Sequence, residues 1–428
     1  MINIGLAGFG TVGGGVWKFL RSQEDLLACR TGARLKISKV ATRTHSKALN
    51  QGVPESLLVP SWKELVADSQ IEIVVELMGG VEEAREFVTA ALRSGKHVVT
   101  ANKALLAAHG EELLGLAGEM GKKLLFEASV AGGIPILKAL QEGLVANRLR
   151  SIHGIINGTC NYILTTMRDQ KRTYEDVLVD AKRLGYAEAD EALDVDGHDT
   201  AHKAAVLAAL AYGVWVPEAK LFTQGIRSIQ QQDIVFARQL GYEVKLLAII
   251  KNDREESLEI RVNPTLIPLS HVLASVDGVF NAISLRGDVV GDALFYGRGA
   301  GEAPTTSSVL ADLAEIAKAR GKKEVLNPWK PLVKNILQIE EIVSRYYLRL
   351  NIEDKPGVLA QVATVLGKHG IGISSVIQPE THEENGVPLI ILLHDAQERK
   401  FTEAVQEIEG LKVVKAPAVW IRVEDFSS

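Results

Sequence analysis

A glycine-rich turn close to the N-terminus constrains the fold of this chain more than any other feature. The turn consists of Gly8, Phe9, Gly10, Thr11, Val12 and Gly13. It follows an apolar run at residues 2–7, which predicts a β-strand, and it opens an amphipathic stretch that predicts a helix. In this pattern the first glycine permits a sharp bend, the second lets a pyrophosphate approach the backbone, and the third lets the helix pack on the strand. We therefore expect a dinucleotide site here; the alternative is a glycine-rich turn without a ligand.

Strand-like and helical patterns alternate through the first third of the sequence. Further strands are predicted at residues 35–41, 71–78 and 97–100, and a helix at 81–94 separates the last two and ends at Gly95. Strand–helix–strand repetition of this kind is typical of a parallel sheet with helices on both faces. The predicted fold of the N-terminal domain is therefore α/β and Rossmann-like.

After about residue 130 the pattern changes to an α+β type with a mixed or antiparallel sheet. The elements expected there are helices at 173–185 and 198–212 and strands at 244–250, 258–262 and 280–286. A later helix, at 307–319, is expected to pack back on the first domain. Residues 346–423 predict the order strand, helix, strand, strand, helix, strand, which is a ferredoxin-like unit.

These patterns divide the chain into domains. The predicted domains are a nucleotide-binding Rossmann domain at 1–130, completed by about 302–325, a catalytic and dimerisation domain at 131–301, a linker at 326–345, and a ferredoxin-like domain at 346–428. Each of the three folded parts is long enough to bury a core of its own.

The charge balance argues against a nucleic acid or an anionic membrane as the main partner. The sequence has 48 Lys and Arg and 53 Asp and Glu, a formal net charge of −5, so neither polyanion would be attracted to the molecule as a whole. Its two cysteines, Cys29 and Cys160, exclude a disulfide framework and fit a reducing compartment. The most apolar stretch, 204–217, is too short to span a bilayer, and residues 2–17 lack the basic leader of a secretory signal. We therefore expect a soluble, cytoplasmic protein.

The residues after the second predicted strand favour NADP over NAD. NAD sites usually offer an Asp or Glu at this place for the ribose 2′-hydroxyl, but the sequence has no acid between Asp25 and Glu55. Arg43 instead lies just after the strand that ends at Ala41, in position to meet a 2′-phosphate. NADP is thus the expected cofactor, with NAD as an alternative. The alternative for Arg43 is a solvated surface charge.

Two lysines are candidates for the chemistry. Asp199 and Lys203 are four residues apart, so on the predicted helix they share one face. Because the residues after Lys203 are almost wholly apolar, we expect that helix to be mostly buried and its lysine to face a cleft; the alternative is an exposed ion pair. Lys103 follows Asn102 at the end of a predicted parallel strand, where open α/β sheets bind ligands. We expect the two lysines, one from each domain, to converge on the cleft.

Several motifs together resemble those of homoserine dehydrogenases, in the same order along the chain. They are Thr100-Ala-Asn-Lys103, Glu127-Ala-Ser-Val-Ala-Gly-Gly133, Asn157-Gly158-Thr159 and the stretch from Asp190 to Lys203. The resemblance covers essentially the whole chain, and residues 346–423 resemble an ACT regulatory domain. It implies the reversible, nicotinamide-dependent reduction of L-aspartate 4-semialdehyde to L-homoserine, in the biosynthesis of threonine, methionine and isoleucine.

The resemblance also implies roles for individual residues. Lys203 would be the acid/base, Lys103 would help to polarise the substrate oxygen beside the nicotinamide, and Asp199 would hold the substrate ammonium together with Glu188. Further residues predicted to bind the substrate are Gly158, Thr159, Tyr186 and Asp194. Residues predicted to contact the cofactor, besides the glycine-rich turn and Arg43, are Thr100, Lys103, Gly299 and Gly301.

Similarity to the family further implies a monovalent cation, sodium in the usual model. Its ligands would be the Glu127 side chain and the backbone carbonyls of Val130, Gly132 and Ile134, hard oxygen ligands that suit such a cation. The family is also typically a homodimer or homotetramer. The ACT domain would bind an amino acid effector, threonine, at an interface between paired units; the alternative is a domain that only mediates assembly.

One departure from the family pattern is Glu191, where a proline usually follows the acid at Asp190. The absence of the proline should loosen the loop, at a cost of up to about 1 kcal/mol of chain entropy. No charged functional group is lost, so we expect activity to survive. Two rival interpretations are a different NADP-linked amino acid dehydrogenase with an ACT domain and a catalytically inactive sensor of NADP and an amino acid. The first has no matching motif beyond the glycine-rich turn, and the presence of Lys103, Lys203 and Asp199 argues against the second.

Overall fold

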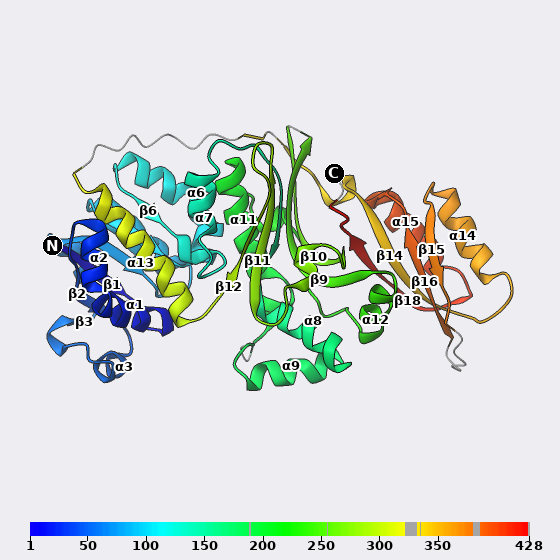
Figure 1. Cartoon of the computed structure of the whole chain (residues 1–428), viewed down its shortest axis with the longest axis horizontal. Coiled ribbons are helices and arrows are strands. Elements are labelled where there is room, and N and C mark those ends of the chain that lie inside the picture. Colours follow the sequence, from blue (N-terminus) through cyan, green and yellow to red (C-terminus); the bar gives the residue numbers. More distant parts are fainter. Residues whose placement is uncertain (188–189, 255, 322–331, 334, 380–385, 427–428) are drawn as a thin grey trace. The chain divides into compact units, whose positions relative to one another are not determined.

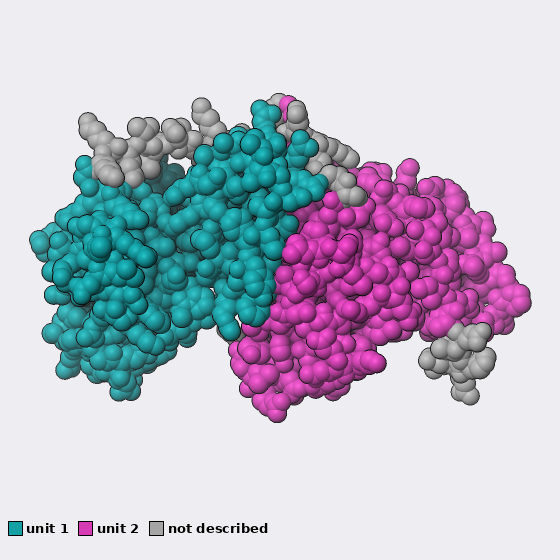
Figure 2. Space-filling view, in the orientation of Figure 1, with its two compact units in different colours: residues 1–150, 202–221, 280–333 teal, residues 151–201, 222–279, 334–428 magenta. Residues whose placement is uncertain are grey.

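The computed structural model describes residues 1–187, 190–254, 256–321, 332–333, 335–379 and 386–426. The chain forms two compact units, shown in Figure 2. The first contains residues 1–150, 202–221 and 280–333, and the second contains residues 151–201, 222–279 and 334–428. This division into compact units does not test the domain boundaries predicted from the sequence, which stay a prediction. Among the helices formed by the described residues, none combines the length and apolar character that a membrane span requires.

A parallel sheet of six strands, in the order β3-β2-β1-β4-β5-β6, forms the centre of the first unit (Figure 1). The strands are β1 Ile2–Ala7, β2 Leu35–Ala41, β3 Leu58–Val59, β4 Ile71–Glu76, β5 His97–Thr100 and β6 Leu124–Leu125. Strand β1 pairs in parallel with both β2 and β4, so the strand order reverses at β1. Open sheets bind ligands at such a switch point, outside the carboxyl ends of the strands. The predicted Rossmann-like fold is confirmed, and β4 ends at Glu76 rather than Met78.

Helices surround this sheet. They are α1 Thr11–Ser22, α2 Glu24–Thr31, α3 His45–Asn50, α4 Lys63–Ala67, α5 Glu82–Arg93, α6 Lys103–Glu119, α7 Ile136–Lys138 and α13 Glu302–Ala319. The amphipathic stretch after the glycine-rich turn is divided at Gln23 into α1 and α2. The predicted helix at 307–319 is confirmed as α13, although it begins at Glu302.

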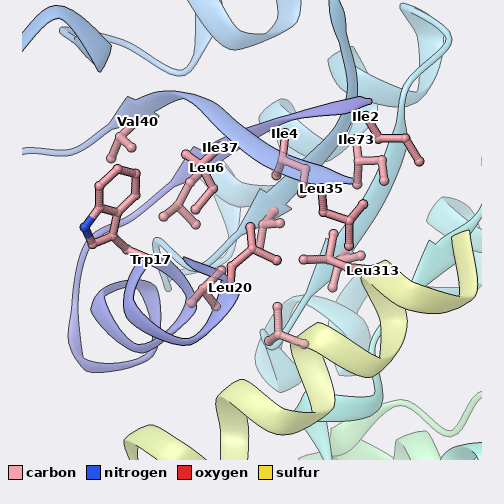
Figure 3. Packing of buried hydrophobic residues seen from close by; sticks show 14 of the residues in the cluster. Ile2, Ile4, Leu6, Trp17, Leu20, Leu35, Ile37, Val40, Ile73 and Leu313 are labelled. Atoms are coloured by element: carbon pink, nitrogen blue, oxygen red, sulfur yellow. The ribbon is translucent and has the colours of Figure 1, made fainter. Parts of the chain in front are cut away.

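Helix α13 packs on the nucleotide-binding sheet, as its sequence position predicts. Its residues Val309 and Leu313 are fully buried in one hydrophobic cluster with Ile4 of β1 and Leu20 of α1. Figure 3 shows Leu313 beside the labelled apolar side chains of the sheet. Burying a side chain of this size stabilises the fold by about 1.5 to 3 kcal/mol, so a segment from late in the sequence holds the first domain together.

The first unit also contains an antiparallel hairpin and most of a long helix. The hairpin joins β11 Phe280–Gly287 to β12 Gly291–Arg298. Helix α11, His198–Tyr212, has the predicted bounds and continues from the second unit into the first at residue 202. The hairpin strand β12 was not predicted from the sequence.

In the second unit the strands follow the order β7-β9-β10-β18-β14-β16-β15. The strands are β7 Leu149–Ile155, β9 Tyr242–Arg254, β10 Ser257–Pro268, β14 Val343–Ile352, β15 Ile373–Ile377, β16 Val387–Leu393 and β18 Val414–Val423, with short β8 Phe222–Thr223, β13 Asn335–Ile336 and β17 Ala396–Gln397. The helices are α8 Gly158–Gln170, α9 Tyr174–Arg183, α10 Ala192–Val195, α12 Gln231–Gln239, α14 Val358–Lys368 and α15 Glu398–Glu409. The sequence predicted α9 and the strands β9 and β10 but neither β7 nor α8.

The predicted ferredoxin-like unit is confirmed in the order β14, α14, β15, β16, α15 and β18. Its sheet is antiparallel, and its last strand β18 also pairs in parallel with β10, through Thr265 with Arg422 and Leu266 with Val423. The two sheets of the second unit are therefore continuous through β18. The guanidinium of Arg422 is buried there and donates to both carboxylate oxygens of Glu398, at 2.9 and 2.6 Å.

Candidate active site

The glycine-rich turn has the geometry that its sequence predicts. Gly8 has a φ of +96°, and a Cβ atom on it would lie 2.3 Å from the carbonyl oxygen of Leu77. A Cβ atom on Gly13 would lie 2.3 Å from the carbonyl oxygen of Gly8, whereas one on Gly10 would meet nothing within 4 Å. The first and third glycines are therefore required by close packing, and the second opens onto free space at the N-terminus of α1. Such a terminus attracts an anion through its N–H groups and the helix dipole.

A cavity of about 260 Å³ adjoins this turn. Its lining includes Gly8, Phe9, Gly10, Arg43, Lys47 and Trp62. Arg43 and Lys47 are both exposed side chains that reach the cavity from the segment after β2. The structure thus brings the predicted phosphate-binding turn and the predicted 2′-phosphate ligand Arg43 to one hollow.

The segment that carries Lys103 follows strand β5 at the same edge of the sheet, and hydrogen bonds hold it in place. Strand β5 ends at Thr100, and Asn102 caps α6 by accepting a hydrogen bond from the Leu105 N–H at 3.1 Å. Lys103 is the first residue of α6. The Thr100 side chain, predicted to contact the cofactor, is fully buried and donates to Glu76 across 2.6 Å. Burial raises the pKa of Glu76, while the hydrogen bonds from Thr100 and neighbouring N–H groups oppose that rise.

The predicted substrate residues of the second unit are held around Asn157, the N-cap of α8. Its side-chain amide donates to Asp194 Oδ1 at 2.8 Å and to Asp199 Oδ2 at 2.9 Å. Thr159 is the second residue of the same helix, and its hydroxyl donates to the carbonyl oxygen of Tyr186 at 2.6 Å. The structure therefore gathers two predicted carboxylates around an amide that the predicted site did not include.

Gly158 and Tyr186, two further residues predicted to bind the substrate, have different surroundings. A Cβ atom on Gly158 would lie 2.9 Å from the Val279 carbonyl oxygen, so this position has no room for a larger residue. Tyr186 is 43% exposed, and its ring lies 4.8 Å from that of Tyr162, between centroids, in a tilted arrangement. Glu188, the other predicted ligand of the substrate ammonium, lies outside the described residues.

Helix α11 carries both Asp199 and Lys203. Their side chains are largely buried, Asp199 at 3% and Lys203 at 9% exposure, which excludes the exposed ion pair that was the alternative. Lys203 and Lys103 belong to the first compact unit, and the convergence of their ammonium groups on one substrate stays a prediction.

The predicted cation segment lies against the predicted cofactor loop. Ala131 and Gly132 have φ values of 53° and 49°, and a Cβ atom on Gly132 would lie 2.3 Å from the carbonyl oxygen of Gly299. The Glu127 carboxylate is 2% exposed and accepts hydrogen bonds from the N–H groups of Leu137, at 3.0 Å, and Lys138, at 2.8 Å. Burial raises the pKa of Glu127, and these two N–H groups oppose that rise.

Hard oxygen ligands fit this segment. Each oxygen of the Glu127 carboxylate accepts one N–H and has a second lone pair. The Gly132 carbonyl oxygen accepts the Ser308 hydroxyl at 2.6 Å and likewise has a second lone pair. In the part of the chain that the structure describes, no three His, Cys, Asp or Glu side chains gather as a metal site, so a metal held by side chains alone does not fit this segment.

Comparison with known proteins agrees with this geometry. The family model of homoserine dehydrogenase matches residues 135–314, that of the homoserine dehydrogenase NAD-binding domain matches residues 8–127, and that of the ACT domain matches residues 346–412. The homoserine dehydrogenase of Pseudomonas aeruginosa is 43% identical over 100% of this chain and 99% of its own length. That of Neisseria gonorrhoeae is 42% identical over 99% of both chains.

Solved structures give the same result. A homoserine dehydrogenase from Thiobacillus denitrificans has a TM-score of 0.93 and 42% identity, covering 99% of this chain and 98% of its own. A hyperthermophilic archaeal homoserine dehydrogenase in complex with NADPH has a TM-score of 0.64 and 28% identity, covering 73% of this chain and 97% of its own. The nucleotide-binding turn, the predicted substrate residues and these full-length matches together lead to one conclusion: this chain belongs to the homoserine dehydrogenase family, whose members are NAD(P)-dependent oxidoreductases.

Proposed function

We propose that this chain interconverts L-aspartate 4-semialdehyde and L-homoserine with Lys203 as the acid/base and NADP(H) as the preferred cofactor. The observation that carries the proposal is the arrangement on α11, where buried Lys203 follows one turn after Asp199 and Asp199 is held by the Asn157 amide. A carboxylate held in one orientation can bind the ammonium group of the substrate, and a buried lysine one helical turn further can exchange a proton with the reacting oxygen.

The residues divide the work of the reaction. Asp199, together with Glu188, binds the ammonium group of the substrate, and Asp194, held by the same amide as Asp199, is a further substrate ligand. Reduced nicotinamide, when bound, supplies the hydride. Lys203 gives its proton to the carbonyl oxygen as charge develops there and takes it back in the reverse direction, and Lys103 polarises that oxygen from the start of α6. Burial of Lys203 favours this transfer because competing water is excluded.

The preference for NADP rests on the cavity beside the glycine-rich turn. Arg43 and Lys47 line it, and the sequence between Asp25 and Glu55 offers no acid to a ribose 2′-hydroxyl. A guanidinium binds phosphate through a charge-assisted, bidentate contact. The NADPH complex of the archaeal relative supports the same preference.

A monovalent cation would be held by Glu127 and the carbonyls of Val130, Gly132 and Ile134. Its charge would compensate a buried carboxylate whose burial is unfavourable, and its binding would fix the backbone that packs on Gly299. Sodium should therefore raise the thermal midpoint of the wild-type protein but not that of Glu127→Gln.

The remaining proposals concern assembly and regulation. We propose a homodimer or homotetramer in the cytoplasm, with threonine as effector at the ACT domain. A test by truncation after Ser344 would mislead, because β18 pairs with β10 and Glu424 contacts buried Arg261 at 3.2 Å. Threonine binding and inhibition are therefore measured on the full chain. Binding without any change in turnover would leave the ACT domain as an assembly module.

The direct test of the function is homoserine-dependent reduction of NADP and of NAD, followed by the absorbance of the reduced nicotinamide. Turnover with homoserine, faster with NADP, is the expected result. Turnover with another hydroxy amino acid but not with homoserine would favour a different dehydrogenase. Cofactor binding without turnover on any of these substrates would favour the inactive sensor.

A further inference from the structure

A buried glutamate lies at the centre of the sheet edge where the cofactor site is built. Glu76, the last residue of β4, is fully buried. In the sheet register it is paired with Ala7 of β1 on one side and with Thr100 of β5 on the other. Ala7 directly precedes the glycine-rich turn, and Thr100 is three residues before Lys103. Glu76 thus lies between the phosphate-binding turn and the segment that carries the proposed polarising lysine.

The Glu76 carboxylate is bonded to both of the loops that leave this edge. One oxygen accepts the Met78 N–H at 2.8 Å and the Gly79 N–H at 3.3 Å. The other accepts the Thr100 hydroxyl at 2.6 Å. The loop after β4 bends back over the carboxylate through Gly79 and Gly80, whose φ values are 75° and 72°, a left-handed conformation that glycine adopts without strain.

The bonds continue from Thr100 to the start of α6. The Thr100 hydroxyl oxygen accepts the Asn102 N–H at 3.0 Å, and the Asn102 amide donates to the Gly80 carbonyl at 2.7 Å. Asn102 also caps α6 through the Leu105 N–H. The two loops are therefore joined to each other and to Glu76, with Lys103 as the next residue along.

The same carboxylate is linked to the glycine-rich turn by backbone. The Leu77 N–H donates to the Ala7 carbonyl at 2.8 Å, and the Leu77 carbonyl is the atom that leaves no room for a Cβ on Gly8. If the loop after β4 shifted, it would therefore collide with the glycine-rich turn, which is proposed to bind the pyrophosphate.

Burying a carboxylate completely is energetically unfavourable, because its charge must be removed from water. The strand positions before it, Ile73, Val74 and Val75, are all buried and apolar. Packing alone would be served by another apolar residue, whereas only an acceptor can bind the Met78 and Gly79 N–H groups and the Thr100 hydroxyl together.

We propose that Glu76 is a positioning residue that sets, through Thr100 and Asn102, the place of Lys103 relative to the glycine-rich turn. The proposal rests on the role of Lys103 given above. Glu76 acts on the reaction through the loop and does not touch the substrate.

The first experiment compares variants along this chain of bonds. Thr100→Val removes the hydroxyl, Thr100→Ser keeps it, and Glu76→Gln keeps the shape of the glutamate but can no longer accept the hydroxyl proton at the same atom. Glu72→Gln is the matched control, because Glu72 is on the same strand but 39% exposed in a surface pair with Arg320. We expect Thr100→Val and Glu76→Gln to lose about 10- to 100-fold in turnover, since a misplacement near 1 Å can cost that much. Glu72→Gln should stay close to wild type, and Thr100→Ser should recover most of the turnover that Thr100→Val loses.

NADPH affinity, measured by fluorescence titration, separates positioning from general damage. For Glu76→Gln the dissociation constant should change by less than about threefold, while turnover falls and the deuterium isotope effect on hydride transfer rises. If Glu76→Gln does not fold, the Thr100 pair carries the test. A loss of NADPH affinity in proportion to the loss of turnover would overturn the proposal, and so would wild-type turnover in Thr100→Val.

The decisive comparison combines Glu76→Gln with Lys103→Ala. If Glu76 acts through Lys103, the double variant should be no slower than Lys103→Ala alone, because two changes in one unit are not additive. Losses that multiply would overturn the proposal. Wild-type turnover in Lys103→Ala would instead reject the role of Lys103 itself, whereas a slow Lys103→Ala beside a fast Glu76→Gln would reject only the positioning role.

Discussion

Asn157 and Asp199 are 42 residues apart in the sequence, yet the Asn157 amide donates to Asp199 Oδ2 across 2.9 Å. The same amide donates to Asp194 Oδ1, and the Asn157 side-chain oxygen accepts the Cys160 N–H at 2.8 Å to cap α8. One side chain thus fixes a helix start and two carboxylates at once. The end of α11 that carries Asp199, the proposed substrate ligand, is therefore fixed by a contact from the start of α8.

Asn157→Ala should therefore weaken substrate binding. Loss of a hydrogen bond to a charged group is worth about 1.5 to 3 kcal/mol, so we expect the KM for homoserine to rise by about tenfold or more, with a smaller change in the KM for NADP. Steady-state kinetics in both substrates check this. Thr173→Ala is the control, because Thr173 caps the neighbouring helix α9 by accepting the Asp176 N–H. Equal homoserine KM values in the two variants would reduce Asn157 to a helix cap.

Arg43→Ala should change the choice of cofactor. Removing a charge-assisted contact to a 2′-phosphate costs about 1.5 to 3 kcal/mol, which predicts a rise of about tenfold or more in the KM for NADP and little change in the KM for NAD. Arg30→Ala removes an exposed arginine of α2 and serves as the control. Parallel losses with NADP and NAD would contradict the role given to Arg43.

Acid should destabilise the second unit through Glu424. Burial alone would raise the pKa of this carboxyl, but the His153 imidazole, 3.8 Å away, and the charges of Lys251 and Arg261 hold the pKa well below the ordinary 4.5. Ionised Glu424 therefore stabilises the fold above about pH 4.5, and this contribution is lost as the pH falls toward the lowered pKa.

Glu424→Gln tests that contribution. At neutral pH it should cost about 3 to 5 kcal/mol, because buried Arg261 and partly buried Lys251 are left beside a neutral group. The difference in thermal midpoint between this variant and wild type should shrink as the pH is lowered. Glu407→Gln, which breaks an exposed pair with Lys368, should have little effect at any pH. A difference that grows toward acid would contradict the direction of the pKa shift.

The fold was predictable wherever one periodicity dominated a segment. The run at 2–7 with its glycine-rich turn and the apolar helix at 198–212 have the predicted bounds. Helix α8 was missed because it begins with Gly158 and Thr159, residues of low helix propensity, and includes further threonines. Strand β12 was missed because it is flanked by glycines and its side chains are mostly half or fully exposed, so no apolar face marks it.

The sequence pointed to candidate site residues where side chains of the right chemistry stood in recognisable motifs. Asp199, Lys203 and Arg43 were predicted in this way, and their roles stay predictions. Glu76 and Asn157 make hydrogen bonds to distant segments, and such pairs leave no local pattern. A signal existed for each: Glu76 is the acid that ends the apolar strand β4, and Asn157 is a preferred N-cap residue before a helix.

Lys203 is the acid/base of the proposed reaction, so the most direct measurement is the turnover of Lys203→Ala with homoserine and NADP, beside its dissociation constant for NADPH. Lys220→Ala, at an exposed lysine, is the control. Loss of an acid/base group predicts a fall in turnover of at least about 100-fold with NADPH affinity nearly unchanged. Turnover close to wild type in Lys203→Ala would contradict the proposed mechanism.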